Sequence, residues 1–365
     1  MRIAHVITKG DVGGAQTHVL ELATAQQIAS DSVLVVAGSA GTAVRRARAR
    51  GIDVVVIPSI DSGSSGPWRM WGRGAFGALA SALEEFEADV VHAHSSAAGL
   101  LARLVARRHR VPSVYTAHGW PFQRGAPTLQ RVFSFAGELV GGHVGDAVIC
   151  LTPEERHRAE RAHVVRRRRV WVIANGLADV RAECRWSSHD GPVGLVMVAR
   201  FAAPKLQDQV VAALTQLTDL PWTMTFVGDG PRRDAASRHA ALALDGRVTF
   251  TGHRDDVPRI LASNDIAILW SAYEGMPISV LEAMRAGLCC VASDLPGVRS
   301  LFGSPEAGAV ASDVASLSTV LRGLIEDDAA RRALGKRARA RYEDAFSAGA
   351  MADATRRVYE AVRER

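Results

Sequence analysis

Residues 174–192 read ANGLADVRAECRWSSHDGP, a polar stretch rich in turn-forming residues that divides the chain into two similar halves. Before this break, short β-branched runs alternate with segments of helical pattern, and after it the same alternation resumes. Apolar strands of this kind, covered by helices on both faces, are typical of a parallel sheet with crossover helices. The pattern therefore predicts an α/β protein of two doubly wound, Rossmann-like domains.

The boundary between these domains is expected near residue 180. Residues 1–178 would form the first domain and residues 179–348 the second, and an amphipathic final helix, about 349–365, would pack back on the first. The two domains would face each other across a cleft that holds the ligand, because ligands of such sheets bind beyond the carboxyl ends of the strands. The expected strands are 2–8, 32–38, 53–59, 89–94, 113–118, 146–152 and 170–175 in the first half, and 193–200, 222–228, 247–252, 266–271 and 289–294 in the second.

Length and composition are those of a globular protein. The 365 residues exceed one ordinary core, and 48% hydrophobic and 22% charged residues argue against wholesale disorder. The first residues, MRIAHVITKGDVGG, do not resemble a signal peptide, and no segment approaches the roughly 20 apolar residues that cross a bilayer. Cys150, Cys184, Cys289 and Cys290 show neither zinc spacing nor a disulfide framework. We therefore expect a cytoplasmic protein.

The net charge of +6 is unevenly placed. Residues 101–169 contain 13 arginines, no lysine and five acidic residues, and the run at 166–169 is the densest part. Two interpretations stand: a solvated arginine-rich surface, or a face that meets anionic lipid headgroups or a phosphorylated acceptor. The second would place the protein peripherally at the inner face of the membrane. Nucleic acid is disfavoured as a partner, because stacking aromatic residues are not interleaved with the arginines.

Two loops that follow predicted strands offer groups that bind phosphate. Gly13 and Gly14 open a helix whose first amides are free to bind an anion. This loop is not GxGxxG and the next strand lacks a ribose-binding acid, which disfavours an NAD-dependent oxidoreductase. Arg200 and Lys205 follow a buried strand, where two cations can converge on a diphosphate and neutralise its charge as it leaves. Taken alone, each loop is also explained as an ordinary turn.

Residues 271–287, SAYEGMPISVLEAMRAG, contain two glutamates eight positions apart. Pro277 suits the start of a helix, so Glu274 would lie in the preceding loop and Glu282 inside the helix. Carboxylates beside a diphosphate would repel it, whereas they bind sugar hydroxyls well. The structural alternative is a capping box of Ser279 and Glu282, which would leave Glu274 unexplained.

With these motifs in place, the chain resembles retaining glycosyltransferases of the GT-B type, in particular glycosyltransferase family 4. The most specific element is E-x7-E, here Glu274 to Glu282. The segments GGAQTHV, DVVHAHSS, YTAHGWPF, VIANGLAD, ARFAAPK, FVGDGP and VTFTGHRDDVP stand around it in the order that the family shows. The chain departs from the family at Leu206, where a glycine is common, and at Arg299 and Ser300, where a glutamate is common. The resemblance covers nearly the full chain and implies the GT-B fold.

The resemblance also implies a role for each matching position. Glu282 would hold the ribose hydroxyls of the nucleotide, Glu274 would sit by the donor sugar as a catalytic residue, and His118 would line the reaction centre. Arginine and lysine side chains would bind the diphosphate, loop amides would lie nearby, and the GHRDD turn would seat the base. The further donor-binding positions are Gly14, Arg200, Lys205, Arg254, Gly275, Met276, Pro277 and Ile278.

His92 and His94 alternate onto one face of a strand end on the acceptor side. A metal site there would need a third ligand, and the sequence does not make one evident. The family departs from DxD-type metal dependence, so arginine, lysine and a helix dipole would replace a divalent ion. We therefore expect neither a metal nor a cofactor.

The implied activity is a retaining, metal-independent hexosyl transfer in polysaccharide or cell-envelope biosynthesis. The donor would be a nucleotide diphosphate sugar, with uridine preferred over guanosine, and the acceptor a lipid-linked or saccharide hydroxyl. One alternative is a GT-B nucleotide-sugar epimerase, which would need a second set of acid–base residues. Another is a non-catalytic sugar-nucleotide-binding protein, which the complete set of expected site residues disfavours. The sugar and linkage depend on pocket contacts that one sequence does not reveal.

Overall fold

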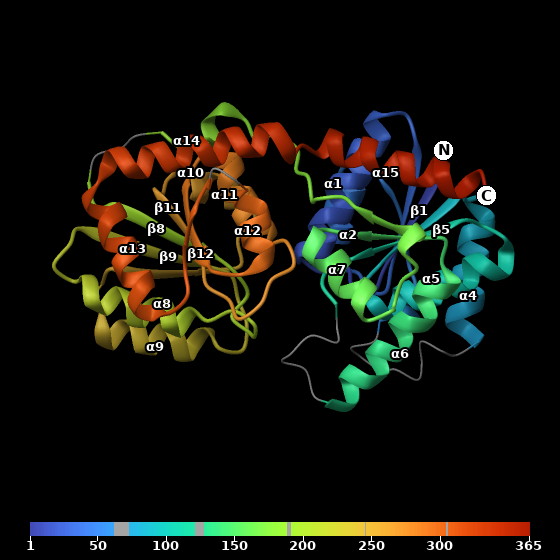
Figure 1. Ribbon diagram of the computed structural model, residues 1–365, viewed down its shortest axis with the longest axis horizontal. Helices are drawn as coiled ribbons and strands as arrows, with labels where there is room; N and C mark the ends of the chain where they lie inside the picture. The colour runs from blue at the N-terminus through green and yellow to red at the C-terminus, as the bar shows by residue number, and fades with distance from the viewer. Residues whose placement is uncertain (62–72, 121–127, 188–190, 245, 304–305) are drawn as a thin grey trace. The chain divides into compact units, whose positions relative to one another are not determined.

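Two parallel sheets, one in each half of the chain, organise the structure (Figure 1). The computed structural model describes residues 1–61, 73–120, 128–187, 191–244, 246–303 and 306–365. These fall into two units, here called unit 1 (Met1–Ala178 and Ala348–Arg365) and unit 2 (Asp179–Ser347). In both, helices cover the two faces of the sheet, as the doubly wound prediction requires.

In the described part of unit 1, seven parallel strands pair in the order β3-β2-β1-β4-β5-β6-β7. The strands β4 and β5 are buried along their whole length, because helices lie on both sides of them. Each strand begins within two residues of its expected start. They are β1 (Arg2–Ile7), β2 (Ser32–Ala37), β3 (Asp53–Val56), β4 (Val90–His94), β5 (Ser113–Ala117), β6 (Ala147–Cys150) and β7 (Val170–Val172).

The C-terminal helix α15 (Ala348–Arg363) completes the core of unit 1 by packing against α1 (Gly14–Ile28). Its buried face includes Val358 and Tyr359, which join a cluster with Ile3. This face buries apolar area that the sheet would otherwise expose. The other helical elements of unit 1 are α2 (Thr42–Ala49), η1 (Pro58–Ile60), α4 (Arg73–Glu85), α5 (Ser96–His109), α6 (Thr128–Val144), α7 (Pro153–Arg161) and η2 (Arg167–Arg169).

In the described part of unit 2, six parallel strands pair in the order β10-β9-β8-β11-β12-β13. They are β8 (Val193–Val198), β9 (Trp222–Val227), β10 (Val248–Gly252), β11 (Ile266–Leu269), β12 (Cys289–Ser293) and β13 (Ala309–Ala311). The sequence pattern did not predict β13, whose three residues are too few to show a period. The helical elements are η3 (Ala182–Cys184), α8 (Gln207–Leu214), η4 (Thr215–Leu217), α9 (Arg233–Ala243), α10 (Val257–Ala262), α11 (Ile278–Ala286), α12 (Pro296–Phe302), α13 (Val314–Glu326) and α14 (Asp328–Ala345).

Both sheets share one topology, and this locates their ligand-binding edges. The strand order reverses between β1 and β4 in unit 1 and between β8 and β11 in unit 2. Ligands of doubly wound sheets bind beyond the carboxyl ends of the strands at such switch points. The loops that follow these four strands are therefore the first place to look for functional side chains.

The basic stretch 101–169 is only partly a surface. Arg103 is fully buried: its Nε donates to the Gly99 carbonyl at 2.9 Å, and its guanidinium lies over the Tyr115 ring, 4.2 Å from the centroid. Glu138 balances this charge, with 3.4 Å between Oε2 and an Arg103 nitrogen. Arg103 therefore adds nothing to a surface patch. Residues 121–127 of the stretch lie outside the described residues.

No helix in the described ranges is both long enough and apolar enough to span a bilayer.

Candidate functional site

Lys205 and Glu274 lie side by side at the switch point of unit 2. An antiparallel bridge between Lys205 and Ser271 joins the loop after β8 to the loop after β11. The Ser271 amide is held in turn by the Ser293 hydroxyl at 2.8 Å. The Lys205 ammonium donates to the Glu274 carboxylate, and only 17% and 14% of the two side chains is exposed. The expected diphosphate-binding cation and the first motif glutamate thus form an ion pair.

Arg200 is exposed on the loop that follows β8, and two glycines after β9 support this loop. Gly228 has a φ of +134°, and a Cβ there would lie 2.2 Å from the Ala199 carbonyl oxygen. Gly230 has a φ of +150°, and a Cβ there would lie 2.5 Å from the carbonyl oxygen of Phe201. Only glycine fits such contacts at such angles. The FVGDGP segment therefore positions the Arg200 loop.

The loop that carries Glu274 rests on the first turn of α12. A Cβ at Gly297 would lie 1.7 Å from the Gly275 carbonyl oxygen and 3.0 Å from that of Glu274. Any larger residue at this position must displace the loop, because the contact is with backbone atoms rather than a flexible side chain. The sequence around Gly297 does not by itself indicate this supporting role.

The helix α11 begins directly after Pro277, as the motif predicts. Pro277 is its N-cap and makes no side-chain cap hydrogen bond, so the capping box of Ser279 and Glu282 is not formed. Glu282 lies inside the helix and is partly exposed, whereas Met276 and Pro277 are buried. Gly275 and Ile278 are partly exposed beside the first turn of α11, whose amides lack intrahelical acceptors.

Arg254 follows β10 in an exposed loop and is already paired. Its guanidinium donates to both carboxylate oxygens of Asp256, at 2.8 and 2.7 Å. This pair raises the pKa of Arg254 and lowers the pKa of Asp256. Arg299, which stands where a glutamate was expected, pairs likewise with Asp294, 2.7 Å from Oδ2.

Gly14 is the first residue of α1, at the switch point of unit 1. The first turn of this helix contains no acidic residue. Its free amides and its dipole therefore favour an anion at this end.

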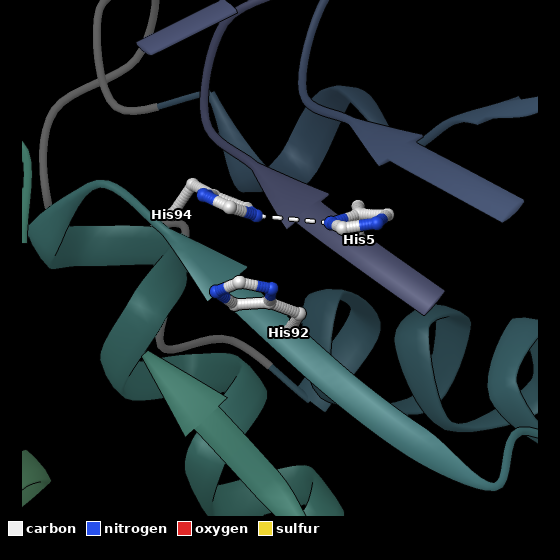
Figure 2. Close-up of side chains that lie close together, drawn as sticks. All are labelled: His5, His92 and His94. Atoms are coloured by element: carbon white, nitrogen blue, oxygen red, sulfur yellow. Dashed lines mark hydrogen bonds between the residues drawn. The ribbon is translucent and has the colours of Figure 1, made fainter. Parts of the chain in front are cut away.

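Histidine side chains from two strands, one helix and one loop lie together near the same switch point. His5 comes from β1, His92 and His94 from β4, His118 follows β5, and His18 comes from α1. Figure 2 shows His5, His92 and His94 close together, with the His5 Nδ1 and His94 Nε2 atoms 3.0 Å apart. A third ligand position beside His92 and His94, which the sequence did not make evident, is therefore present as His5.

The hydrogen bonds of this cluster form a chain that runs, donor to acceptor, from His118 to Gln26. The Gln26 amide nitrogen donates to the Tyr359 hydroxyl at 3.2 Å, so its oxygen accepts from His5 Nε2 at 2.7 Å. His5 Nδ1 then accepts from His94 Nε2. His94 Nδ1 accepts from His118 Nε2 at 3.2 Å. The chain ends at His118, which therefore keeps the lone pair of its Nδ1 atom.

Burial keeps these imidazoles neutral. It lowers the pKa of His5 and of His18 to about 4, and it lowers the pKa of His92, His94 and His118 well below the usual range. His92 and His94 have no exposed surface, whereas His118 is partly exposed. Of the three histidines expected near the acceptor, His118 alone can be reached directly in this structure.

Two comparisons with known families span most of the chain. Residues 12–181 match the family described as Glycosyltransferase Family 4, and residues 185–341 match the family described as Glycosyl transferases group 1. The chain belongs to glycosyltransferase family 4. It is therefore a glycosyltransferase that uses a nucleotide-sugar donor, and the recognition made from the motifs is confirmed.

Relatives of this family-4 enzyme act on different acceptors. It is 28% identical over 234 residues to an Escherichia coli UDP-Gal:alpha-D-GlcNAc-diphosphoundecaprenol alpha-1,3-galactosyltransferase, a match that spans 59% of this chain and 60% of that enzyme. It is also 28% identical over 293 residues to a glycogen synthase of Mycobacterium tuberculosis, over 75% of this chain and 69% of that one.

Solved structures confirm the GT-B fold of the family-4 enzyme. HepE from Anabaena, in complex with UDP and glucose, aligns with a TM-score of 0.83 at 20% identity, over 99% of this chain and 100% of that one. Sucrose-phosphate synthase from Thermosynechococcus elongatus aligns with a TM-score of 0.80 at 19% identity, over 98% of both chains.

The sequence motifs of this family-4 enzyme did not indicate His5 or His18 as site residues. His5 stands inside the apolar run RIAHVI, where a polar residue in a buried strand is a signal worth following. His18 carries no such signal, because it follows a glycine turn on a helix of mixed composition. Only the strand order β1-β4-β5 brings them to His94 and His118.

Proposed function

We propose that this family-4 enzyme transfers a sugar from a UDP-sugar to a hydroxyl of a lipid-linked or saccharide acceptor, with retention of anomeric configuration. The observation that carries the donor half of the proposal is the Lys205–Glu274 pair at the switch point of unit 2, in which Lys205 lies on the loop that also carries Arg200. Uridine is supported by the UDP-Gal of the E. coli relative and by the UDP in the HepE structure.

Donor binding, in this proposal, exchanges the partner of Lys205. The diphosphate carries more negative charge than one carboxylate, so it draws the Lys205 ammonium away from Glu274. The released Glu274 then accepts hydrogen bonds from hydroxyls of the donor sugar. Arg200 binds the diphosphate from the neighbouring loop, and Glu282 holds the ribose hydroxyls. Arg254 contributes to binding of the base while it remains paired with Asp256.

Transfer breaks the bond between the anomeric carbon and the diphosphate oxygen and forms a bond from that carbon to the acceptor oxygen on the same face. The diphosphate oxygen that is released takes the acceptor proton. Arg200, Lys205 and the first amides of α11 stabilise the charge that develops on it. These groups supply the positive charge that a divalent ion supplies elsewhere, so the transfer is proposed to be independent of metal. His118 offers its Nδ1 lone pair to a hydroxyl.

A lipid-linked acceptor is favoured by the surface of unit 1. Phe133 and Val140 of α6 are 71% and 49% exposed. Arg166 to Arg168, in the same basic stretch, are exposed as well. Exposed apolar and arginine side chains together suit an anionic lipid surface. The E. coli relative, whose name specifies a diphosphoundecaprenol acceptor, supports the same class.

The proposal is tested first by thermal unfolding with UDP, GDP, ADP and NAD in excess. A ligand at about 100 times its dissociation constant adds roughly 2.7 kcal/mol, a shift of several degrees. We expect UDP alone to shift the transition. A shift with GDP alone would show that the donor carries guanosine instead of uridine. No shift with any nucleoside diphosphate would overturn the proposed donor site.

The alternatives are separated by following the sugar. Incubation with UDP-sugars and polyprenyl-linked acceptors should give an α-linked product from an α-linked donor, read from the anomeric coupling by NMR. Epimerised donor in the absence of acceptor would identify an epimerase. Tight UDP binding without any product from a panel of donors and acceptors would support a binding protein.

A further inference from the structure

Three imidazoles of unit 1 are arranged around a common point. One nitrogen of each of His18, His94 and His118 lies within 4.8 Å of the other two. The ring centroids are 5.3 Å apart for His18 and His94, 4.7 Å for His18 and His118, and 5.4 Å for His94 and His118. We propose that these three side chains form a binding site for a divalent transition-metal ion of the zinc class.

The spacing agrees with tetrahedral coordination. Zinc binds imidazole nitrogen at about 2 Å, so two ligand nitrogens lie about 3.3 Å apart and their ring centroids about 5 Å apart. The His94 Nδ1 and His118 Nε2 atoms are 3.2 Å apart. All three centroid distances lie near the tetrahedral value. The His18 nitrogen lies within 4.8 Å of the other two, so an ion would draw it closer by up to about 1.5 Å.

His18 provides an independent indication of a ligand. Its side chain is 2% exposed, and its Nε2 atom has no hydrogen-bond partner within the described ranges of the chain. Its Nδ1–H donates to the Asn175 amide oxygen at 2.8 Å, which leaves a lone pair on Nε2. Buried polar atoms normally find partners, and a buried lone pair without one is costly. A metal ion would satisfy it.

The supporting hydrogen bonds are those that metal-binding histidines use. The second nitrogen of His94 is held by His5, and that of His18 by Asn175. Such outer partners orient the ring and select the tautomer. His94 therefore already directs a lone pair from Nδ1 toward the site. His118 presents Nε2–H there, and moving its proton to Nδ1 completes the ligand set without releasing a proton.

The neighbouring trio of His5, His92 and His94 is a poorer site. Both nitrogens of His92 are engaged, Nδ1 with the Tyr359 hydroxyl at 2.6 Å and Nε2 with the Thr116 hydroxyl at 2.7 Å. Its ring lies only 4.2 Å from that of His94. In Figure 2 the drawn hydrogen bond joins His5 to His94, and none reaches His92. The ion is therefore assigned to the trio that includes His118.

The ligand chemistry selects the ion. Neutral imidazole nitrogens suit zinc, cobalt, nickel and copper, whereas magnesium and calcium require oxygen ligands. His18 donates from Nδ1 to Asn175, so the lone pair of its Nε2 atom is available to such an ion. His118 is partly exposed, so a solvent molecule can occupy the fourth position. The site shares His118 with the proposed transfer: with an ion on Nε2, His118 carries its proton on Nδ1 and donates to the hydroxyl instead of accepting from it.

The test is titration of the full-length, chelator-treated protein with Co²⁺, followed by the visible absorption that tetrahedral cobalt produces. We expect one ion per chain and displacement by Zn²⁺. His18→Gln should weaken binding at least about tenfold, and Asn175→Leu about tenfold through loss of ring orientation. His239→Gln, on the exposed surface of α9, is the matched control and should leave the affinity unchanged.

His92→Gln distinguishes the two trios. It should change cobalt affinity less than about threefold. A loss as large as that of His18→Gln would place the ion in the trio of His5, His92 and His94 and overturn the assignment. Binding lost with His239→Gln instead would identify surface adsorption. X-ray absorption of the zinc-loaded wild type should show three imidazoles, and one imidazole or none would reject the site even if a variant failed to fold.

Discussion

At the residue scale, the Lys205–Glu274 ion pair is the feature with the most direct consequence for donor binding. Both side chains are mostly buried, so their attraction is screened less than that of a surface pair. The pair sits at the switch point, where the proposal places the diphosphate. In the proposal, the diphosphate of the nucleotide therefore has to replace the Glu274 carboxylate as the partner of the Lys205 ammonium.

The first prediction concerns this competition. Glu274→Gln should let UDP bind about threefold to tenfold more tightly, because it frees Lys205 and removes a charge that repels the diphosphate. The same variant should lose about 100-fold or more in sugar transfer, because it weakens hydrogen bonds to the donor sugar. Calorimetric titration with UDP and a transfer assay measure the two effects.

Two matched variants interpret the result. Lys205→Met should weaken UDP binding by about tenfold or more, since it removes the cation itself. Glu282→Gln should weaken UDP binding through the ribose and leave Lys205 paired. If Glu274→Gln weakened UDP binding as much as Lys205→Met, Glu274 would not be a competitor of the diphosphate, and the proposed exchange would be wrong.

At the scale of elements, loops after the strands carry the site and glycines set their positions. Gly228 and Gly230 support the backbone of the Arg200 loop, and Gly297 supports that of Glu274 and Gly275. These contacts are between backbones, so they are rigid in a way that side-chain contacts are not. The sheet thereby holds the loops of Arg200 and Glu274, which we propose to face the phosphate and the sugar, in place before a ligand arrives.

The second prediction tests this support. Gly297→Ala places a methyl group 1.7 Å from the Gly275 carbonyl oxygen and must displace the loop. We expect transfer to fall by about tenfold or more and the unfolding free energy to fall by about 1–3 kcal/mol. Gly323→Ala is the control, because no atom of a neighbour lies within 4 Å of its new Cβ.

Gly323→Ala should leave the transfer rate unchanged. It should leave the unfolding free energy unchanged or raise it slightly, since alanine favours a helix by up to about 1 kcal/mol over glycine. Transfer rates with saturating donor, together with urea unfolding of both variants, provide the comparison. Equal transfer by Gly297→Ala and wild type would show that α12 does not position Glu274.

At the scale of the whole molecule, the buried histidine cluster couples the stability of unit 1 to pH. The folded pKa of His5 and of His18 is about 4, below the unfolded value of 6.5. Above pH 6.5 both states are neutral and the two residues contribute no pH dependence. As the pH falls from 6.5 toward 4, only the unfolded chain takes up these protons, and stability is lost.

The third prediction is the size of that loss. Each of the two histidines should remove about 1.4 kcal/mol of unfolding free energy per pH unit in this window, roughly 3 kcal/mol per pH unit for the two together. Glu155 opposes it in part: burial raises the pKa of Glu155 to about 7, so its contribution increases as the pH falls. Urea unfolding between about pH 7.5 and pH 5 measures the slope. His18→Gln should reduce it by about one proton, and a flat profile in the wild type would contradict the neutral cluster.

The fourth prediction concerns the membrane. The purified protein should bind vesicles of anionic lipid at low salt and be released as salt rises, because the attraction depends on the basic face. Replacing Arg166, Arg167 and Arg168 by serine should weaken binding by about 1 kcal/mol for each charge in contact. Arg169 is kept, since it donates to the Gly145 carbonyl at 2.9 Å.

Phe133→Ser on α6 should weaken binding to the same vesicles without changing its dependence on salt, since this side chain is apolar and 71% exposed. Vesicle sedimentation measures both variants. Failure of the wild type to bind anionic vesicles at low salt would remove the membrane from the proposal, and a free saccharide acceptor would then be favoured.

The sequence by itself determined the two parallel sheets and the family. Buried strands in a doubly wound sheet are runs of β-branched residues, so their pattern is local and each predicted strand starts within two residues of the observed one. The Glu274–Glu282 motif is local as well, because Pro277 starts α11 between them. The short β13 escaped prediction because three residues show no period.

Only the tertiary structure decided which groups meet. Lys205 and Glu274 are 69 residues apart, and His5 and His94 are 89 apart. Their contacts depend on strand order, which crossover connections set at a distance and which no local pattern encodes. Burial is likewise decided by packing: Arg103 counted as surface charge in the sequence and is enclosed in the core of unit 1. In this enzyme the candidate site residues lie in local motifs. Which of them pair, which are protonated and which are exposed is decided by the sheet that brings the motifs together.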